Sequence, residues 1–415
     1  HAIPGRGGPA ALTVAGTIGG WQEALALAGD WGGRIPLTEL LADAIAYARQ
    51  GVAVCASQSR LTAEKCTELE GVPGFADAFL TEGAVPAEGV RQTFPALADT
   101  LQRLAEAGLD DFYRGDVARA LAVDLEAAGS PVRLEDLEAY RARRVAPLSL
   151  AIDGARLFNM PPPTQGAASL AILGILDRLK RYDTSGAGFI HDAVEATKQA
   201  FLMRNAKVFD PVFMDVEPEA LVSKEAIARM AAAVDPDRAA PWPQPAVPGD
   251  TIWMGAIDEE GRAVSFIQSI YWEFGSGVVS PSTGVLWQNR GMSFSLDPEH
   301  PNALAPGRLP FHTLNPAMAL FDDGRTLTYG TMGGEGQPQT QAAVFARYAW
   351  GGLGLQAAVT EPRWLLGRTW GADSTNLKLE SRFATEIVDA LRAAGHDVEL
   401  VDAFSDTMGH AGAIV

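Results

Sequence analysis

The segment that most constrains the fold is residues 251–269, "TIWMGAIDEEGRAVSFIQS", in which two strand-like runs flank the loop "EEG". A three-residue loop that ends in glycine is a favoured hairpin connection, because glycine accepts the left-handed conformation there. If Asp258 pairs with Arg262, the register places Thr251 opposite Ser269 at the open end of the hairpin. Directly opposed residues have Cβ atoms about 4.5–5.5 Å apart, so we expect two hydroxyl groups to meet there.

Thr251 follows the proline-rich run "APWPQPAVPGD" at residues 240–250. The simpler interpretation is a turn residue that opens a strand. The alternative is a nucleophile that becomes a chain terminus when the bond after Asp250 breaks. A threonine hydroxyl needs a base, which can be a histidine, a lysine or the residue's own α-amine, whose pKa of about 7.7–8.0 suits the task. No histidine lies near Thr251 in the sequence, although one can approach it in space, so both interpretations stay open.

The first half of the chain is expected to be mostly helical. Helical spacing of apolar residues, with glycine stops, predicts helices over 35–51, 94–108, 115–129, 133–140 and 188–210, and residues 161–179 are expected to carry a Pro-rich loop into an apolar helix. Between them, "LSLAID" and "ARLFNM" alternate around Asp153-Gly154, which predicts a hairpin. In the motif "MPPPTQG" (160–166), which leads into one of these helices, we expect a structural role rather than a floor for the site.

Strands and glycine-rich turns dominate from residue 251 onward, interrupted by two predicted helices near 338–351 and 382–395. The proline-rich composition of residues 236–250 is therefore the best candidate boundary, dividing the chain into portions 1–250 and 251–415. Surface linkers commonly have this composition.

Composition excludes several classes of function. The formal net charge of −18 and the absence of a Lys/Arg block argue against a nucleic-acid partner. Two cysteines, Cys55 and Cys66, provide neither a disulfide framework nor a zinc site, and they slightly favour a reduced compartment. No apolar run is long enough to cross a bilayer, so no membrane partner is expected. We expect a cytoplasmic protein, with a periplasmic or secreted one as the alternative because the chain starts at His1 without Met.

Seven segments resemble the γ-glutamyltransferase family of N-terminal nucleophile (Ntn) hydrolases, and they occur in the family's order. Two lie in the first half and five in the second; they are "MPPPTQG", "HDAVEATKQAF", Thr251 with "AIDEEGRAVSFIQS", "FGSGVVSPSTGVLWQNRG", "NALAPGRLPFHTLNPAMAL", "GTMGGEGQP" and "EPRW". The resemblance implies an α/β fold, a four-layer αββα sandwich with two antiparallel sheets flanked by helices. It also implies autocatalytic cleavage between Asp250 and Thr251, which divides one intertwined domain into a large (1–250) and a small (251–415) subunit.

The resemblance assigns roles to individual residues. Thr251 matches the nucleophile that forms an acyl ester, Ser269 its supporting hydroxyl, and Gly333 and Gly334 the oxyanion-hole glycines. Small residues suit that position because backbone N–H groups must approach the developing oxyanion closely. His312 and Thr313 match a serine pair near the substrate, with a buried structural histidine as the equal alternative for His312. No metal or organic cofactor is implied, and a dimer of heterodimers is expected.

Departures from the family pattern bear on the substrate. Ser293 stands where γ-glutamyltransferases carry an acid for the substrate's α-amino group, and the family's N-terminal portion with its carboxylate-binding arginine is not in this chain. The end at "GHAGAIV" also looks early for the family. Tyr271, Asn289 and Arg290 are expected to bind substrate, in a pattern similar to the oxamate amidohydrolase branch.

Arg290 suits a carboxylate because a guanidinium binds it through two parallel hydrogen bonds, whereas an exposed arginine is the alternative. Trp253, Tyr271, Trp272 and Trp287 either line an apolar pocket or belong to the core. We therefore expect an amidohydrolase of a small anionic amide such as oxamate. The alternatives are a γ-glutamyl hydrolase or transferase, a cephalosporin-acylase-like enzyme, and an uncleaved, inactive homologue with a binding role.

Overall fold

The computed structural model describes residues 2–244, 249–368 and 374–415, which form two compact units that alternate along the chain. Unit 1 comprises the chain up to Arg144 together with Ile270–Leu296, and unit 2 comprises Val145–Ser269 and Asp297–Val415. The described residues of the proline-rich stretch, 236–244 and 249–250, lie within unit 2, so they do not mark the boundary between the two units. The division into subunits at 250/251 concerns the cleavage of a bond and stays a prediction.

Unit 1 is mainly helical. Its helices are α1 (Thr17–Asp30), α2 (Leu37–Leu40), α3 (Ala42–Gln50), α4 (Ala56–Leu69), α5 (Phe75–Phe79), α6 (Pro95–Ala107), α7 (Asp111–Arg114), α8 (Asp116–Ala127) and α9 (Leu134–Ala139). Two short strands, β1 (Val52–Ala53) and β2 (Arg91–Gln92), pair antiparallel, and 3₁₀ helices η1 (Gly8–Ala10) and η4 (Arg290–Ser293) complete it. The helices expected over 94–108, 115–129 and 133–140 are confirmed, whereas α1 and α4 were not predicted.

The helix expected over 35–51 is interrupted at Leu41, which lies between α2 and α3. The apolar face inferred from the spacing is buried at Leu41, Ile45 and Ala48, but Leu40 is 47% exposed. Leu37 is half-buried against the core of unit 1, so Leu40 is the leucine of the predicted face that is exposed. The predicted stop at Gly51, with a φ of 91°, is confirmed.

Unit 2 contains most of the strands. They are β3 (Leu148–Ile152), β4 (Ala155–Asn159), β5 (Asp250–Ile257), β6 (Ala263–Tyr271), β7 (Ala317–Phe321), β8 (Thr326–Thr331), β9 (Trp364–Leu366), β10 (Leu377–Glu380), β11 (Val398–Val401) and β12 (Ala411–Ile414). Its helices are α10 (Gly166–Leu179), α11 (Ala187–Lys207), α12 (Lys224–Ala232), α13 (Gly336–Ala349), α14 (Leu355–Thr360) and α15 (Thr385–Ala393), with 3₁₀ helices η2 (Pro211–Phe213), η3 (Pro218–Val222) and η5 (Asp406–Met408). The predicted helices 161–179, 188–210, 338–351 and 382–395 are confirmed within a few residues.

The main sheet of unit 2 is antiparallel, with strand order β12-β8-β7-β4-β3. The hairpin predicted around Asp153-Gly154 is confirmed, since Ile152 pairs with Ala155 across that two-residue turn. A smaller sheet orders β11-β10-β9, and β5 pairs with β6.

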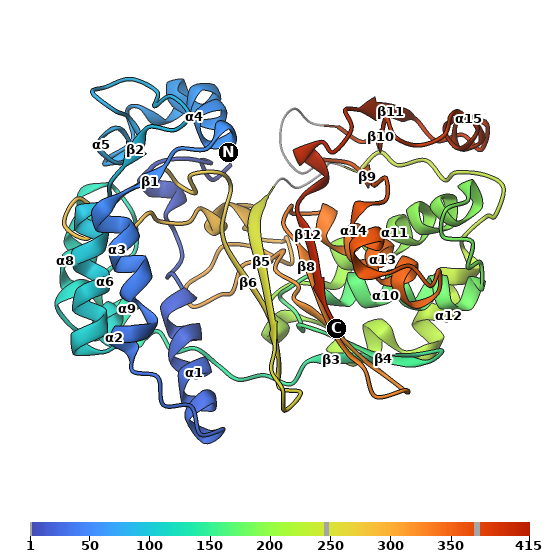
Figure 1. Ribbon diagram of the computed structural model, residues 1–415, viewed down its shortest axis with the longest axis horizontal. Helices are drawn as coiled ribbons and strands as arrows, with labels where there is room; N and C mark the ends of the chain where they lie inside the picture. The colour runs from blue at the N-terminus through green and yellow to red at the C-terminus, as the bar shows by residue number, and fades with distance from the viewer. Residues whose placement is uncertain (1, 245–248, 369–373) are drawn as a thin grey trace. The chain divides into compact units, whose positions relative to one another are not determined.

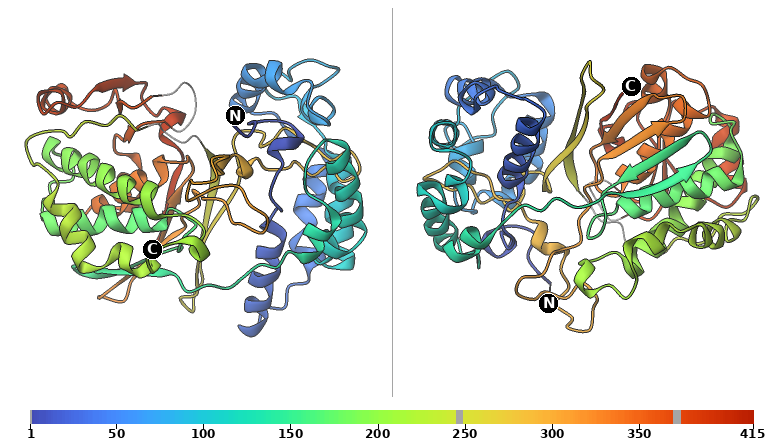
Figure 2. Two further views of the ribbon diagram at one scale, coloured as in Figure 1. Left: turned by 180° about the vertical axis from the view of Figure 1, so that it is seen from behind. Right: turned by 90° about the horizontal axis from the view of Figure 1, so that it is seen from below.

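Helices and the β5–β6 hairpin lie against the main sheet of unit 2, as Figures 1 and 2 show. Successive side chains of a strand point to opposite faces. On β8, Leu327 and Tyr329 are buried in the core that α10, α11 and α13 share. Thr328 and Gly330 therefore face the opposite side, where β5 packs. These layers hold the segment around Thr251 on one face of the sheet.

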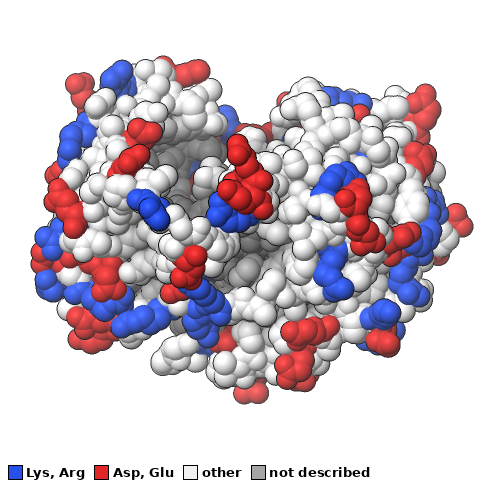
Figure 3. Space-filling view, turned by 60° about the horizontal axis from the view of Figure 1, so that its bottom comes forward, with Lys and Arg blue, Asp and Glu red and all other residues white. Residues whose placement is uncertain are grey.

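The surface carries interspersed charges of both signs on the face shown in Figure 3. Among the described residues, no helix combines the length and the apolar character needed to span a bilayer. Cys55 and Cys66 are both free thiols. The described part of the chain contains no group of three or more side chains suited to hold a metal ion.

Candidate active site

The β5–β6 hairpin has the turn that the sequence predicts. The N–H of Asp258 donates to the carbonyl of Arg262 at 3.1 Å, and Gly261 adopts a φ of 80°. At the open end, Thr251 Oγ1 donates to Ser269 Oγ at 3.2 Å. The predicted meeting of two hydroxyl groups is confirmed. The threonine at the start of β5 therefore has a second hydroxyl group as its hydrogen-bond partner.

Trp253 fixes the strand that begins with Thr251. Its indole Nε1 donates to Ser265 Oγ on β6 at 2.9 Å. The ring lies against two glycines that pair in the main sheet: a Cβ atom at Gly330 would be 2.1 Å from Trp253 Cδ1, and one at Gly412 would be 2.6 Å from its Cζ3. Only glycine leaves room for the indole at this point, so the half-buried Trp253 packs against the main sheet.

The same contacts give the direction of β5 across β8. A Cβ atom at Gly255 would be 2.9 Å from Thr328 Oγ1, while Trp253 lies against Gly330. Moving toward the start of β5 therefore corresponds to moving toward the end of β8. One further step of the alternation brings Thr251 toward the segment that follows Thr331, where the predicted oxyanion-hole glycines lie.

Gly333 and Gly334 form a buried turn between β8 and α13. Their φ angles are 101° and 34°, a left-handed conformation that glycine adopts without steric cost. The N–H of Gly336 donates to the carbonyl of Gly333 at 2.7 Å and begins the helix. A turn of consecutive left-handed glycines before a helix is the kind of backbone that can present N–H groups to an oxyanion.

His312 and Thr313 lie beside the loop that precedes α10. The N–H of His312 donates to the carbonyl of Pro163 at 2.8 Å, and the N–H of Gln165 donates to the carbonyl of His312 at 3.0 Å. The N–H of Leu314 donates to His312 Nδ1 at 3.3 Å, so the imidazole accepts a backbone hydrogen bond. Thr313 is fully buried. The motif "MPPPTQG" thus positions the 312–313 segment, in line with the structural role expected for it.

Tyr271, Asn289 and Arg290 come together in unit 1. Arg290 Cζ lies 3.5 Å from the centre of the Tyr271 ring, and Tyr271 has a φ of 82°, an uncommon backbone conformation for a tyrosine. Arg290 NH1 donates to Ser293 Oγ at 3.1 Å. Burial lowers the pKa of the Arg290 guanidinium to about 10, so the group keeps its charge at neutral pH. Arg290 is 4% exposed, and the alternative of an exposed surface arginine is wrong.

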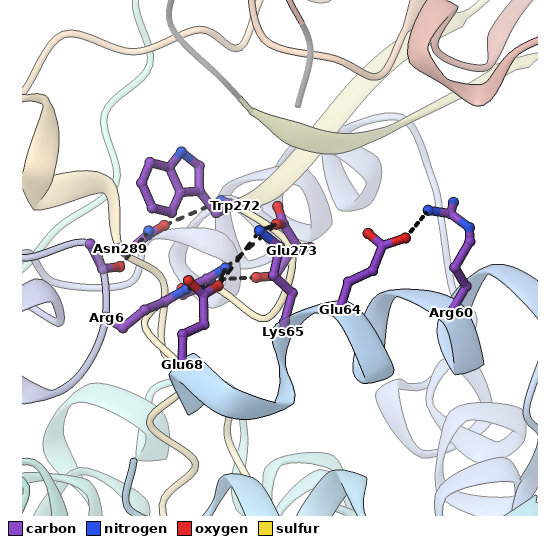
Figure 4. Close-up of polar contacts among 10 residues, drawn as sticks. Arg6, Arg60, Glu64, Lys65, Glu68, Trp272, Glu273 and Asn289 are labelled. Carbon is purple, nitrogen blue, oxygen red and sulfur yellow. Dashed lines mark hydrogen bonds and ion pairs between the residues drawn. The ribbon is translucent and has the colours of Figure 1, made fainter. Parts of the chain in front are cut away.

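The side chain of Asn289 makes hydrogen bonds with backbone groups of unit 1. Its Nδ2 donates to the carbonyl of Gly5 at 2.9 Å, and its Oδ1 accepts from the N–H of Trp272 at 3.2 Å (Figure 4). Beside it, Arg6 pairs with Glu68 at 2.9 Å, and its guanidinium lies 5.3 Å from the centre of the Trp272 ring (Figure 4). Substrate binding by Asn289 stays a prediction, whereas its structural contacts are evident.

A buried polar group beneath the glycine turn was not predicted from the sequence. It consists of Gln165 before α10, Arg204 on α11 and Glu335 next to Gly334, which are 0%, 2% and 4% exposed. The signal was available in the glutamine of "MPPPTQG" and in the acid of "GGEG", but neither spacing nor periodicity relates residues 170 positions apart. Only the packing of α10 and α11 under the turn brings them together.

Comparison with known proteins identifies relatives over the whole chain. The family profile described as gamma-glutamyltranspeptidase matches residues 2–415. The oxamate amidohydrolase proenzyme of Klebsiella pneumoniae is 56% identical over 414 residues, covering 100% of this chain and 78% of that protein. The glutathione hydrolase-like YwrD proenzyme of Bacillus subtilis is 40% identical over 415 residues, with the same coverage of 100% and 78%.

A solved structure is similar to this chain over nearly its whole length. The crystal structure of cephalosporin acylase from Bacillus halodurans superposes with a TM-score of 0.88 and 33% identity, covering 99% of this chain and 75% of that one. The fold class expected from the sequence, an αββα Ntn-hydrolase sandwich with antiparallel sheets, is confirmed.

Proposed function

Because the chain belongs to the gamma-glutamyltranspeptidase family, we propose that it hydrolyses a small anionic amide such as oxamate through Thr251. The observation that carries the proposal is the hydrogen bond of 3.2 Å between Thr251 Oγ1 and Ser269 Oγ at the start of β5. The substrate class is supported by the 56% identity to a protein named oxamate amidohydrolase proenzyme. The proenzyme names of the relatives also imply that both subunits arise from one precursor.

Maturation of the chain requires one acyl shift. The Thr251 hydroxyl attacks the carbonyl carbon of Asp250, the C–N bond between them breaks, and the acyl group moves to Oγ as an ester. Water then hydrolyses this ester, which leaves a carboxyl group on Asp250 and a free hydroxyl and α-amine on Thr251. The amine now lies on the nucleophile itself, and its pKa of about 7.7–8.0 suits a general base near neutral pH.

Turnover repeats this chemistry on the substrate. The α-amine of Thr251 takes the hydroxyl proton as Oγ attacks the amide carbon, and the N–H groups of Gly333 and Gly334 stabilise the oxyanion. The tetrahedral intermediate collapses, the amide nitrogen leaves with a proton as ammonia or an amine, and water hydrolyses the threonyl ester. Ser269 supports the hydroxyl of Thr251 in both stages. No step calls for a metal or an organic cofactor.

Arg290 is proposed to bind the carboxylate of the substrate. A guanidinium is the side chain best suited to a carboxylate, because two parallel N–H groups match its two oxygens. Burial of Arg290, together with its position over the Tyr271 ring, holds the charge in one orientation. Tyr271, His312 and Thr313 complete the proposed binding set.

The nucleophile is tested by two substitutions at one position. Thr251→Ala should abolish both the cleavage at 250/251 and the hydrolysis of oxamate, because no hydroxyl remains. Thr251→Ser should retain some of each. Denaturing electrophoresis and mass spectrometry follow the cleavage, and release of ammonia follows turnover. Cleavage at 250/251 that persists in the alanine variant contradicts the mechanism.

The substrate is tested with a panel of amides: oxamate, its neutral analogue oxamide, a γ-glutamyl anilide and a glutaryl amide. Preferred hydrolysis of oxamate supports the proposal. The glutaryl amide represents a second candidate, an acylase, which the TM-score of 0.88 to cephalosporin acylase favours. A chain that stays intact and hydrolyses no amide would instead be the inactive homologue with a binding role.

The role of Arg290 is tested by comparing oxamate with oxamide. Arg290→Gln should raise KM for oxamate by about 10- to 100-fold, the effect of losing a charged hydrogen-bonded partner, and should change KM for oxamide much less. An unchanged KM for oxamate would exclude the carboxylate role.

We also propose a dimer of heterodimers, which light scattering tests, and a cytoplasmic location, which fractionation of the source cells tests.

A further inference from the structure

We infer that Gln165 is a positioning residue for acyl transfer, because its side-chain amide connects the glycine turn to the 312–313 segment. This inference rests on the proposed function, since it assigns a task to the turn that stabilises the oxyanion. Gln165 Nε2 donates to the carbonyl of Gly334 at 2.7 Å and to the carbonyl of Thr313 at 2.8 Å. The side chain is fully buried, so both bonds form away from water.

Arg204 determines which way the amide of Gln165 points. Arg204 NH1 donates to Gln165 Oε1 at 3.0 Å. A guanidinium has donors only, so the oxygen of the amide must face it and the nitrogen must face the two carbonyl groups. The alternative flipped amide would place two donors against each other and two carbonyls against an acceptor. The orientation of the glutamine side chain is therefore fixed by chemistry, and its two donors both point at loop carbonyls.

The glycine turn is held at two adjacent residues by the same group. Gln165 binds the carbonyl of Gly334, and Arg204 NH2 pairs with Glu335 Oε1 at 2.5 Å. Arg204 is 2% exposed and its guanidinium also lies 3.9 Å from the centre of the Phe201 ring, so it has a defined place on α11. The turn is thus anchored from below to α10 and α11, not only through its own backbone.

This anchoring matters because glycine has more backbone freedom than any other residue. An oxyanion hole works when its donors are already aimed at the position where negative charge develops. The peptide that joins Gly334 to Glu335 cannot rotate without breaking the bond from Gln165. Restraining this peptide restrains the ψ angle of Gly334, and the bond from the N–H of Gly336 to the carbonyl of Gly333 holds the preceding peptide, which carries the N–H of Gly334.

The bond from Gln165 to the carbonyl of Thr313 connects the same side chain to a segment that is proposed to bind substrate. The side chain of Gln165 donates to the carbonyl of Thr313, and its backbone N–H donates to the carbonyl of His312. These two bonds tie the 312–313 segment to the loop before α10. One buried glutamine thus sets the spacing between the oxyanion turn and a segment proposed to bind substrate. The expected consequence of losing it is a lower rate of the chemical step rather than weaker binding.

Gln165→Met is the main test, because methionine has a similar length and volume but cannot donate to the two carbonyl groups. On the cleaved enzyme with oxamate as substrate, kcat should fall by about 10- to 100-fold, less than the loss of a whole oxyanion donor, while KM changes by less than about threefold. Gln165→Glu is the second variant; it keeps the contact with Arg204 and replaces the donor by an acceptor, and the same fall in kcat is expected.

The matched control is Gln341→Met. Gln341 is also a buried glutamine, 2% exposed, and its Nε2 donates to the carbonyl of Asn315 at 2.6 Å rather than to the glycine turn. Its substitution should also lower the melting temperature, although by less than Gln165→Met because one carbonyl rather than two loses its donor, and should leave kcat within about threefold of the wild type.

Several outcomes overturn the inference. A kcat for Gln165→Met or Gln165→Glu within twofold of the wild type does so, as does a loss confined to KM or an equal fall in kcat for Gln341→Met. Loss of folding in both Gln165 variants but not in Gln341→Met makes the residue structural and overturns it as well. A wild-type chain that neither cleaves nor hydrolyses any amide refutes the proposed function itself, and the inference with it.

Discussion

The indole of Trp253 occupies the space that a side chain at Gly330 would fill: a Cβ atom there would lie 2.1 Å from Trp253 Cδ1. Trp253 is two residues from Thr251 on β5, and Gly330 is three residues before Gly333 on the β8 side. The contact therefore fixes the strand of the proposed nucleophile against the strand that leads into the proposed oxyanion turn.

Gly330→Ala should separate these two strands. The added methyl group cannot be accommodated without moving the indole, and overpacking of this kind typically costs about 1–3 kcal/mol of unfolding free energy. We expect slower cleavage at 250/251 and a lower midpoint in urea denaturation. Gly354→Ala is the control, because nothing lies within 4 Å of a Cβ atom at that position. Equal stability and cleavage in the two variants would show that Trp253 does not hold β5 in place.

Ser269→Ala should slow both cleavage and turnover. The hydroxyl of Ser269 accepts a hydrogen bond from Thr251 at 3.2 Å, and a net contribution of about 1 kcal/mol corresponds to a rate change of roughly 5- to 10-fold. Single-turnover kinetics with oxamate measures the effect. Ser265→Ala offers a contrast on the same strand, since Ser265 accepts from Trp253 Nε1. That variant should lose stability and keep the rate of the matured enzyme within about threefold; a larger effect on rate at 265 than at 269 would refute the assignment.

Local patterns in the sequence were sufficient for the hairpin and most helices. The register between Thr251 and Ser269 follows from the loop length and the period of two, and both are properties of neighbouring residues. The break at Leu41 was not predicted, because helical spacing continues through it. The space for Trp253 over Gly330 and the bond from Gln165 to Gly334 depend on packing between distant segments. Such contacts leave no periodic signal, so the packing around the proposed site was not predicted, and the catalytic roles of Thr251 and Ser269 stay predictions.

A buried histidine pair should make stability depend on pH. His191 Nε2 lies 2.8 Å from the carbonyl of Asp235, to which it must donate, so its Nδ1 accepts from His396 Nε2 at 2.9 Å. Burial, with further contributions from the Lys198 charge and His191, lowers the pKa of His396 to about 3. In the unfolded chain a histidine has a pKa of about 6.5.

Between about pH 6.5 and 3 the unfolded chain therefore binds one more proton at His396 than the folded chain. The free energy of unfolding should fall as the pH decreases through this window, by up to about 1.4 kcal/mol per pH unit from this group. His396→Gln keeps a donor for His191 and removes the titration, so the dependence should become shallower in urea titrations at several pH values. The control is the same substitution at the exposed His410. An unchanged slope in His396→Gln would contradict the prediction.

Ser293→Asp should give the Arg290 guanidinium an ion pair within the protein in place of the proposed substrate carboxylate. Arg290 NH1 donates to Ser293 Oγ at 3.1 Å, so a carboxylate at this position would lie within reach of the guanidinium. An internal ion pair competes with the substrate carboxylate for the same donors. The new negative charge beside the proposed site also repels the substrate carboxylate. We expect KM for oxamate to rise by about 10-fold or more, while KM for the neutral oxamide stays within about threefold. Ser295→Asp adds the same charge two residues away and should have a smaller effect on both substrates. If Ser293→Asp leaves oxamate binding intact, Arg290 does not bind the substrate carboxylate, and the anionic substrate class loses its main support in this chain.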